Sequence, residues 1–140
     1  MSLFISVQAF AALGGDVSSV QADQVHMNAS LRTMQRSGYV KHELHSLGGM
    51  IVREFASTDG RIFAVSWNGP SPPDLRQLLG SHFDDFQQAA EAQKGRGPHG
   101  PLFIQQNGLV VQTGGHMRSY AGHAYLTDQV PAGVRVEDLW

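Results

Sequence analysis

Four residues with reactive or ligand-binding side chains lie close together near the C-terminal end of the chain: His116, Arg118, Tyr120 and His123. Imidazoles act as general acids, general bases and metal ligands, and a guanidinium binds anions through paired N–H groups. The pattern predicts one continuous strand through this segment, and residues seven apart on a strand point to opposite faces. The two histidines then share neither a metal ion nor a reacting group unless a bulge at Gly122 resets the alternation. We therefore expect no catalytic set; the alternative is a small hydrolase or anion-binding enzyme centred on these four residues.

Two further residues are candidates for binding rather than catalysis. Arg53, on a predicted strand, joins Arg118 as an anion ligand if both reach the same face. The alternative is a surface arginine whose stem covers aromatic neighbours. Trp67 and Tyr120 are the candidate aromatic anchors, because rigid aromatic side chains dominate interfaces. The predicted binding set, with no catalytic residue assigned, is Arg53, Trp67, His116, Arg118, Tyr120 and His123.

Other reaction chemistry finds little support in the sequence. There are no cysteines, which excludes thiol catalysis, disulfides and cysteine metal sites. His42 and His45 are three apart on a predicted strand and face opposite sides, so we expect no metal site and no cofactor. The glycine pairs at 48–49 and 114–115 precede neither Lys-Ser/Thr nor a helix, so we interpret them as turns rather than phosphate-binding loops.

Charge and hydropathy disfavour two classes of partner. The chain has 140 residues, a net charge of −2 at pH 7 and a pI of about 6.4. Domains that bind nucleic-acid phosphates usually carry an excess of basic residues, so we expect no nucleic-acid partner. No segment approaches the roughly 20 apolar residues of a membrane helix, so we expect no transmembrane segment. The length suits one domain, which we place at residues 12–140.

The N-terminal half predicts one helix followed by a strand meander. Asp16 is a suitable N-cap, and apolar residues at helical spacing predict a helix from about Val17 to Arg32, closed before Gly38. Alternating patterns then predict three strands, with turns at Gly48-Gly49 and at Thr58-Asp59-Gly60. The strands cover residues 39–47, 50–56 and 61–67, the last with Phe63, Val65 and Trp67 on one face.

The C-terminal half repeats that order. Asp74 predicts an N-cap that forms a capping box with Gln77, and an apolar stripe predicts a helix that continues to about Lys94. Asn107-Gly108 predicts a type I′ hairpin with Ile104 opposite Val111. We expect strands at residues 102–106, 109–113 and 116–126, and Trp140 packed on the body. The predicted fold is α+β: an antiparallel sheet of about six strands in two three-strand meanders, with two amphipathic helices on one face.

The first residues resemble part of an export signal. Residues 3–12 are mostly apolar, and Ala9-Phe10-Ala11 is the small-x-small triplet that signal peptidase needs. No Lys or Arg precedes the apolar run, and Gln8 interrupts it. Taken alone, the pattern leaves two interpretations of residues 1–11 equally open: a signal-peptide remnant, or a strand or an ordinary chain end.

Several blocks resemble a family of small exported proteobacterial proteins filed as a domain of unknown function. The blocks are "ALGGD" at Ala12, "VREF…DGRIFAVSWNGP" from Val52, "PDLRQLLGSHF" from Pro73 and "GGHMRSYAGHAYL" from Gly114. The resemblance implies that residues 1–11 are a leader remnant, and it implies no activity, cofactor or catalytic residue. We therefore expect a periplasmic or secreted protein, a non-enzymatic binding or structural module whose partner in the cell envelope is an unknown protein or small molecule.

Overall fold

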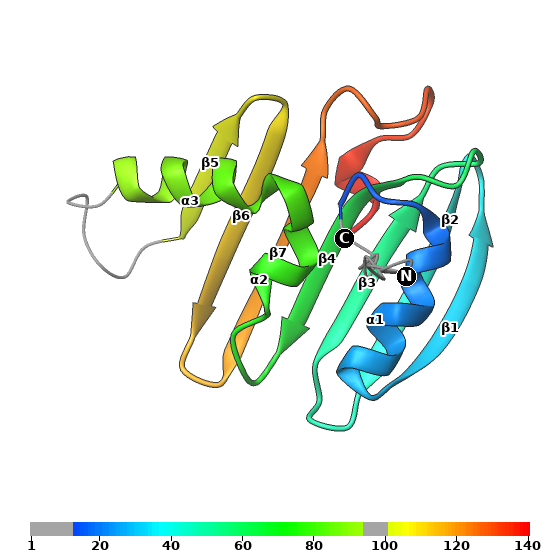
Figure 1. Ribbon diagram of the computed structural model, residues 1–140, viewed down its shortest axis with the longest axis horizontal. Helices are drawn as coiled ribbons and strands as arrows, with labels where there is room; N and C mark the ends of the chain where they lie inside the picture. The colour runs from blue at the N-terminus through cyan, green and yellow to red at the C-terminus, as the bar shows by residue number, and fades with distance from the viewer. Residues whose placement is uncertain (1–12, 94–100) are drawn as a thin grey trace, which may run out of the picture.

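A computed structural model describes residues 13–93 and 101–140. It contains a seven-stranded antiparallel sheet with strand order β1-β2-β3-β4-β7-β6-β5 (Figure 1). The strands are β1 (Ala29–Arg36), β2 (Tyr39–Ser46), β3 (Ile51–Ala56), β4 (Ile62–Gly69), β5 (Leu102–Gln106), β6 (Leu109–His116) and β7 (Ser119–Leu126). The α-helices are α1 (Val20–Met27), α2 (Leu75–Leu79) and α3 (Phe83–Ala92), and the 3-10 helices are η1 (Val17–Ser19), η2 (Gly80–His82) and η3 (Val136–Asp138). The α+β class and the antiparallel sheet are confirmed.

The first helix is shorter than predicted. The residues predicted to form its C-terminal half belong instead to an additional strand of the sheet, β1. Helix α1 ends at Met27, because Asn28 adopts a left-handed conformation with φ 49°. Residues 29–36 then pair with all eight residues of β2, so Leu31 belongs to a strand rather than to the helix. Gly38, at φ 85°, forms the β1–β2 turn instead of closing a helix. Hydrogen bonding along a whole strand outweighs the weak helical spacing.

The second predicted helix is divided into α2, η2 and α3. The Asp74 carboxylate caps α2 by accepting a hydrogen bond from the Gln77 N–H at 3.2 Å, as predicted. The capping box is wrong in its second half, because the Gln77 side chain donates to Asp23 instead. Gly80, at φ 53°, breaks the helix. The apolar stripe still packs on the sheet through Leu75, Leu78, Leu79, Phe83 and Phe86.

The hairpins show one correct and one wrong prediction. Asn107 and Gly108 have φ values of 51° and 80°, and Ile104 lies opposite Val111. The predicted turn at Gly114-Gly115 is wrong, since both glycines lie inside β6 and the chain turns at residues 117–118. The segment from 116 to 126 is therefore not one strand.

The two faces of the sheet are covered by different parts of the chain. On the helix-covered face, α1 lies over the β1–β3 side and α2 and α3 over the other side (Figure 1). The residues of this face include Leu44, Val52, Val65, Trp67, Ile104, Val111, Ala124 and Leu126. On the opposite face, which we call the open face, residues of the C-terminal segment 127–140 pack over Phe55, Phe63 and Ala64, and Trp140 stacks on His123. Phe63 therefore does not share a face with Val65 and Trp67, because the β3–β4 register shifts beside Phe55 and Ala56.

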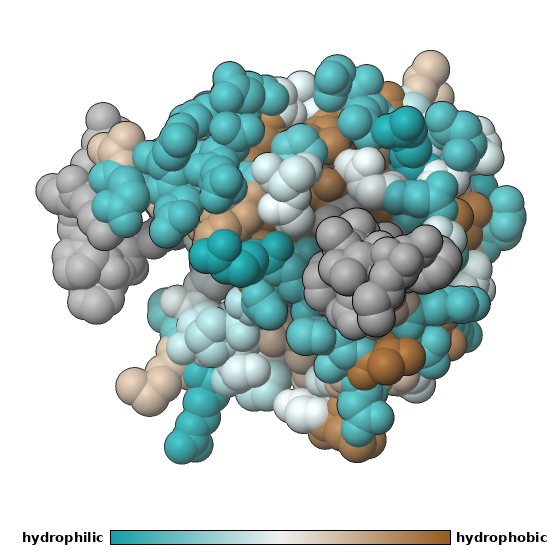
Figure 2. Space-filling model, viewed as in Figure 1, coloured by the Kyte–Doolittle hydropathy of each residue, from teal (hydrophilic) through white to brown (hydrophobic). Residues whose placement is uncertain are grey.

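The outside of the helix-covered face is hydrophilic over α3, where teal side chains dominate Figure 2. Within the described ranges 13–93 and 101–140, no helix has the length and apolar character needed to cross a bilayer.

Candidate functional site

The predicted binding residues are divided between the two faces of the sheet. His116 lies opposite Ser119 at the end of the β6–β7 hairpin, whereas His123 lies opposite Gln112. Four residues of strand separate the two positions, roughly 13 Å at 3.3 Å per residue. The β6–β7 register is continuous, so Gly122 forms no bulge. The histidines remain apart, but the reason is their separation along the hairpin and not the alternation predicted for one strand.

His116 and Tyr120 line a hollow of about 650 Å³ beside the helices, together with residues such as Leu75 and Phe86. Arg118 lies in the turn at φ 68°, is exposed, and is not part of the lining. Because His123 lies outside this hollow, the structure does not bring the four residues of the enzyme alternative together.

Trp67 is a core residue with 3 % of its surface exposed. Its indole lies over Gly122, where an added Cβ would come within 2.5 Å of the ring atom Cζ2. A surface anchor must be accessible to its partner, so the exposure expected of Trp67 is wrong. Tyr120 is half-buried.

A row of polar residues crosses the open face at one register level. Glu43 lies opposite Arg53, Arg53 opposite Ser66, Ser66 opposite His123, and His123 opposite Gln112. Neighbouring residues in such a row stand about 4.5–5.5 Å apart at their Cβ atoms. The row therefore brings a guanidinium, a hydroxyl and an imidazole together on three adjacent strands.

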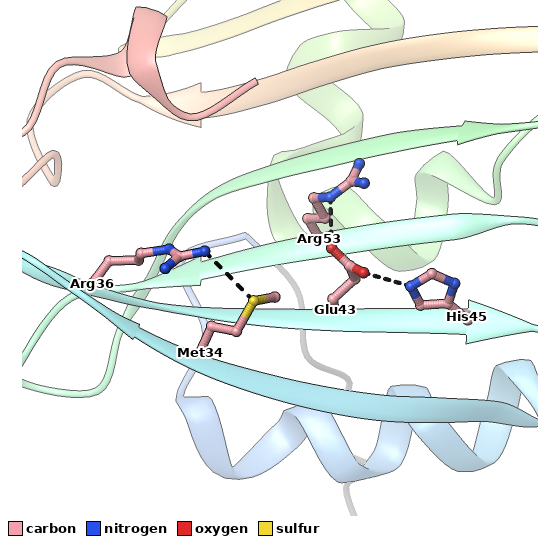
Figure 3. Close-up of polar contacts among 5 residues, drawn as sticks. All are labelled: Met34, Arg36, Glu43, His45 and Arg53. Carbon is pink, nitrogen blue, oxygen red and sulfur yellow. Dashed lines mark hydrogen bonds and ion pairs between the residues drawn. The ribbon is translucent and has the colours of Figure 1, made fainter.

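Arg53 is held in place by Glu43. Its Nε donates to Glu43 Oε2 at 2.9 Å, while His45 Nε2 lies 2.5 Å from Glu43 Oε1. The hydrogen bond from His45 lowers the pKa of Glu43, and the hydrogen bond from Arg53 lowers it further against the opposing effect of burial. The terminal nitrogens of Arg53 point away from the carboxylate (Figure 3), and no side chain of the described residues forms an ion pair with them. They are available to a second anion.

Trp140 covers His123. The two rings stack with centroids 3.9 Å apart and an interplanar angle of 13°. Burial lowers the pKa of His123, so the imidazole is neutral at neutral pH. The expectation that Trp140 packs on the body is confirmed, and it packs on a predicted binding residue.

These residues surround a hollow of about 440 Å³ on the open face, the open-face hollow, lined by Arg53, Ser66, Asn68, His123 and Trp140 among others. The Ser66 hydroxyl is buried and has no hydrogen-bond partner in the described part of the chain. A buried polar group without a partner is costly, and a ligand atom could supply the missing bond. Gly114 and Ala121, which lack bulky side chains, line a further hollow on the β6 side of His123.

Sequence reasoning missed Ser66 and Trp140 as members of this site. The alternation that assigned Val65 and Trp67 to one face already placed Ser66 on the other, which was the available signal. No sequence pattern predicts which strand residue a C-terminal tryptophan covers. Within residues 13–93 and 101–140, no group of three His, Asp or Glu side chains is arranged to hold a metal ion.

The family model described as "Protein of unknown function (DUF2844)" matches residues 9–139. The chain belongs to this family. The match covers nearly the whole sequence, including all seven strands and the open-face hollow except Trp140. Neither the curated proteins nor the solved structures contain a significant match.

Proposed function

We propose that the protein is a non-enzymatic binding module that holds a small anion, bearing a carboxylate or a phosphate, in the open-face hollow. The observation that carries the proposal is the position of Arg53. Glu43 holds its Nε, and the guanidinium lines the same hollow as its cross-strand neighbour Ser66, whose buried hydroxyl has no hydrogen-bond partner among the described residues. A planar guanidinium with two free N–H groups matches the two oxygens of a carboxylate.

The surroundings of Arg53 favour an anion over a neutral ligand. Glu43 contacts Arg53 through Oε2 and His45 through Oε1, so only one oxygen of its carboxylate faces the guanidinium. The half-exposed setting keeps the cost of desolvating the guanidinium low, while the indole of Trp140 supplies an apolar wall. Such a site combines a few placed polar groups with an apolar lining, as small-molecule sites generally do.

Calorimetric titration with benzoate and with inorganic phosphate tests the proposal. We expect saturable binding of at least one probe, and a loss of about tenfold or more in affinity in Arg53→Gln, because a charge-assisted pair contributes about 1.5–3 kcal/mol. Arg36→Gln is the matched control, since Arg36 is an exposed arginine on β1 that does not line the hollow. Equal binding by the wild type and Arg53→Gln would reject Arg53 as the anchor.

The proposed location is the periplasm or the cell surface. Support comes from the small-x-small triplet Ala9-Phe10-Ala11, which lies outside the described residues. Mass spectrometry of the protein recovered from fractionated bacterial cells tests this. We expect an envelope fraction with a mature N-terminus at Ala12, and an unprocessed form in Ala11→Asp. Recovery of the unprocessed wild type from the cytoplasm would contradict the proposed location.

A further inference from the structure

Two carboxyl groups meet inside the helix-covered half of the core. Glu54 on β3 and Asp23 on α1 are both 0 % exposed. No N–H group in the described part of the chain donates to either oxygen of Glu54. Glutamate and aspartate are almost never fully buried without a partner, because a lone buried charge is very costly. The pair therefore needs a physical explanation that the anion site on the other face does not provide.

An amide on a neighbouring helix contacts the pair. Gln77 on α2 donates its side-chain N–H to Asp23 Oδ1 at 2.7 Å. Burial raises the pKa of Glu54 well above its ordinary value, and the hydrogen bond to Asp23 and its charge raise it further. The raised pKa favours the protonated form of Glu54, and a proton on Glu54 can be shared with the adjacent Asp23 carboxylate, as in other carboxyl pairs.

Apolar packing holds α1 only weakly. Val20 is buried and Met27 is partly buried against the core, but Val25 is 80 % exposed. The helix has eight residues and no side-chain hydrogen bond at its N-cap. Isolated helices of this length are not stable in water, so contacts with the sheet and with α2 must keep α1 in place.

Other titratable groups of residues 13–93 and 101–140 lie near the pair. His42 on β2 is the cross-strand neighbour of Glu54, and burial lowers its pKa, so it carries no compensating charge at neutral or alkaline pH. Its Nδ1 lies 3.1 Å from Thr33 Oγ1 on β1. His26 on α1 and Asp74 at the start of α2 line the hollow that Gln77 also lines. On β4, the residue opposite Glu54 is the uncharged Val65.

We propose that Asp23 and Glu54 form a proton-dependent latch that docks α1 on the sheet and releases it when the shared proton is lost at alkaline pH. Two adjacent carboxylates in an apolar interior repel each other, and solvation of both requires α1 to move away. The direction of the pH dependence follows from the raised pKa of Glu54 in the folded state. Its contribution to stability is complete at low pH and is lost as the pH rises through that value.

Spin-label distances test the latch directly. The chain has no cysteine, so labels at Val25→Cys on α1 and Gln105→Cys on β5 have no background. We expect one narrow distance at neutral pH and its loss at alkaline pH. A reference pair on the sheet, Gln35→Cys with Gln105→Cys, should keep its distance under both conditions. If both pairs change together, the protein unfolds as a whole and the latch is rejected.

Two substitutions test whether loss of the proton, rather than unfolding of the protein, releases α1. Glu54→Gln keeps a group that donates to Asp23 but cannot lose a proton, so α1 should stay docked at alkaline pH. If the first variant folds poorly, Asp23→Asn removes the charge on the helix side and supplies an amide that can donate to an ionised Glu54, so α1 should again stay docked at alkaline pH. Glu43→Gln, on the neighbouring strand and the other face, should release α1 as the wild type does. The proposal is overturned if the wild-type distance does not change with pH, or if Glu54→Gln and Asp23→Asn both lose it as readily as the wild type.

Discussion

Two glutamates on adjacent strands show how the two faces of the sheet differ. Glu43 points to the open face, where Arg53 and His45 contact it and keep it ionised. Glu54 points to the helix-covered face, where burial and the neighbouring Asp23 raise its pKa. The residue type and the sheet are the same, but the two pKa values are shifted in opposite directions. The face on which a side chain lies therefore decides whether it takes part in surface electrostatics or in helix docking.

The largest expected effect concerns the two apolar clusters. Leu79 is 0 % exposed in the helix-covered core, and Leu139 is 7 % exposed in the smaller open-face cluster. Leu79→Ala should lower the free energy of unfolding by about 2–5 kcal/mol, the usual cost of a core cavity. Leu139→Ala should cost less, since the C-terminal segment can collapse onto the gap. Urea unfolding measures both. Equal losses would show that the open face is as tightly packed as the helix-covered face.

Two glycines on the β6–β7 hairpin sharpen the comparison. Gly122 faces the helices, and an added Cβ would meet the Trp67 ring at 2.5 Å and the Gln112 carbonyl oxygen at 2.6 Å. Gly114 faces the other way, and its added Cβ would meet only the Ala121 carbonyl oxygen, at 3.9 Å. Gly122→Ala should therefore destabilise the fold by about 1–3 kcal/mol. Gly114→Ala should be close to neutral in the same thermal unfolding measurement, and a similar loss in both variants would contradict the packing described for Trp67.

We expect the two glutamates to affect the free energy of unfolding at opposite ends of the pH range. The pKa of Glu43 is lowered, so its contribution is present at neutral pH and is lost as the pH falls through the folded-state value. Glu43→Gln should flatten the acid limb of unfolding free energy against pH by no more than about 1 kcal/mol, because exposed ion pairs contribute little. Glu54→Gln should leave the acid limb unchanged and flatten the alkaline limb. Denaturant unfolding at a series of pH values distinguishes the two, and an alkaline effect of Glu43→Gln would contradict the assignment.

The smallest expected effect is on one imidazole. Burial lowers the pKa of His123 on the open face and that of His42 on the helix-covered face. Trp140→Ala removes the ring that stacks on His123, so the pKa of His123 should rise towards its ordinary value while that of His42 stays lowered. Proton NMR of the imidazole signals follows both. An unchanged pKa for His123 would show that Trp140 does not shield it in solution.

Local sequence signals predicted the parts of the fold that short-range chemistry determines. Asn107-Gly108 gave the hairpin and Asp74 gave a helix N-terminus, because each acts through its own backbone. Strand β1 was not predictable in the same way, since its residues become a strand only by pairing with β2. The break at Gly80 was equally hidden, because the apolar stripe continues through it.

The candidate site was only partly predictable for the same reason. Arg53 and His123 were candidates by residue type, but their proximity arises from β4 pairing with β7, strands more than 50 residues apart in sequence. The stacking of Trp140 depends on the path of the C-terminal segment. The pairing of Asp23 with Glu54 depends on where α1 docks, and no local pattern determines that.

The most direct test of the central claim, that the open-face hollow is the binding site, is an NMR titration of the isotope-labelled protein with benzoate and with phosphate. The account predicts saturable shifts at the Arg53 Nε–H group and the Trp140 indole N–H, with little change at the Tyr120 and His116 amides on the hairpin end. Shifts that cluster at Tyr120 and His116 while Arg53 and Trp140 stay unchanged would contradict it.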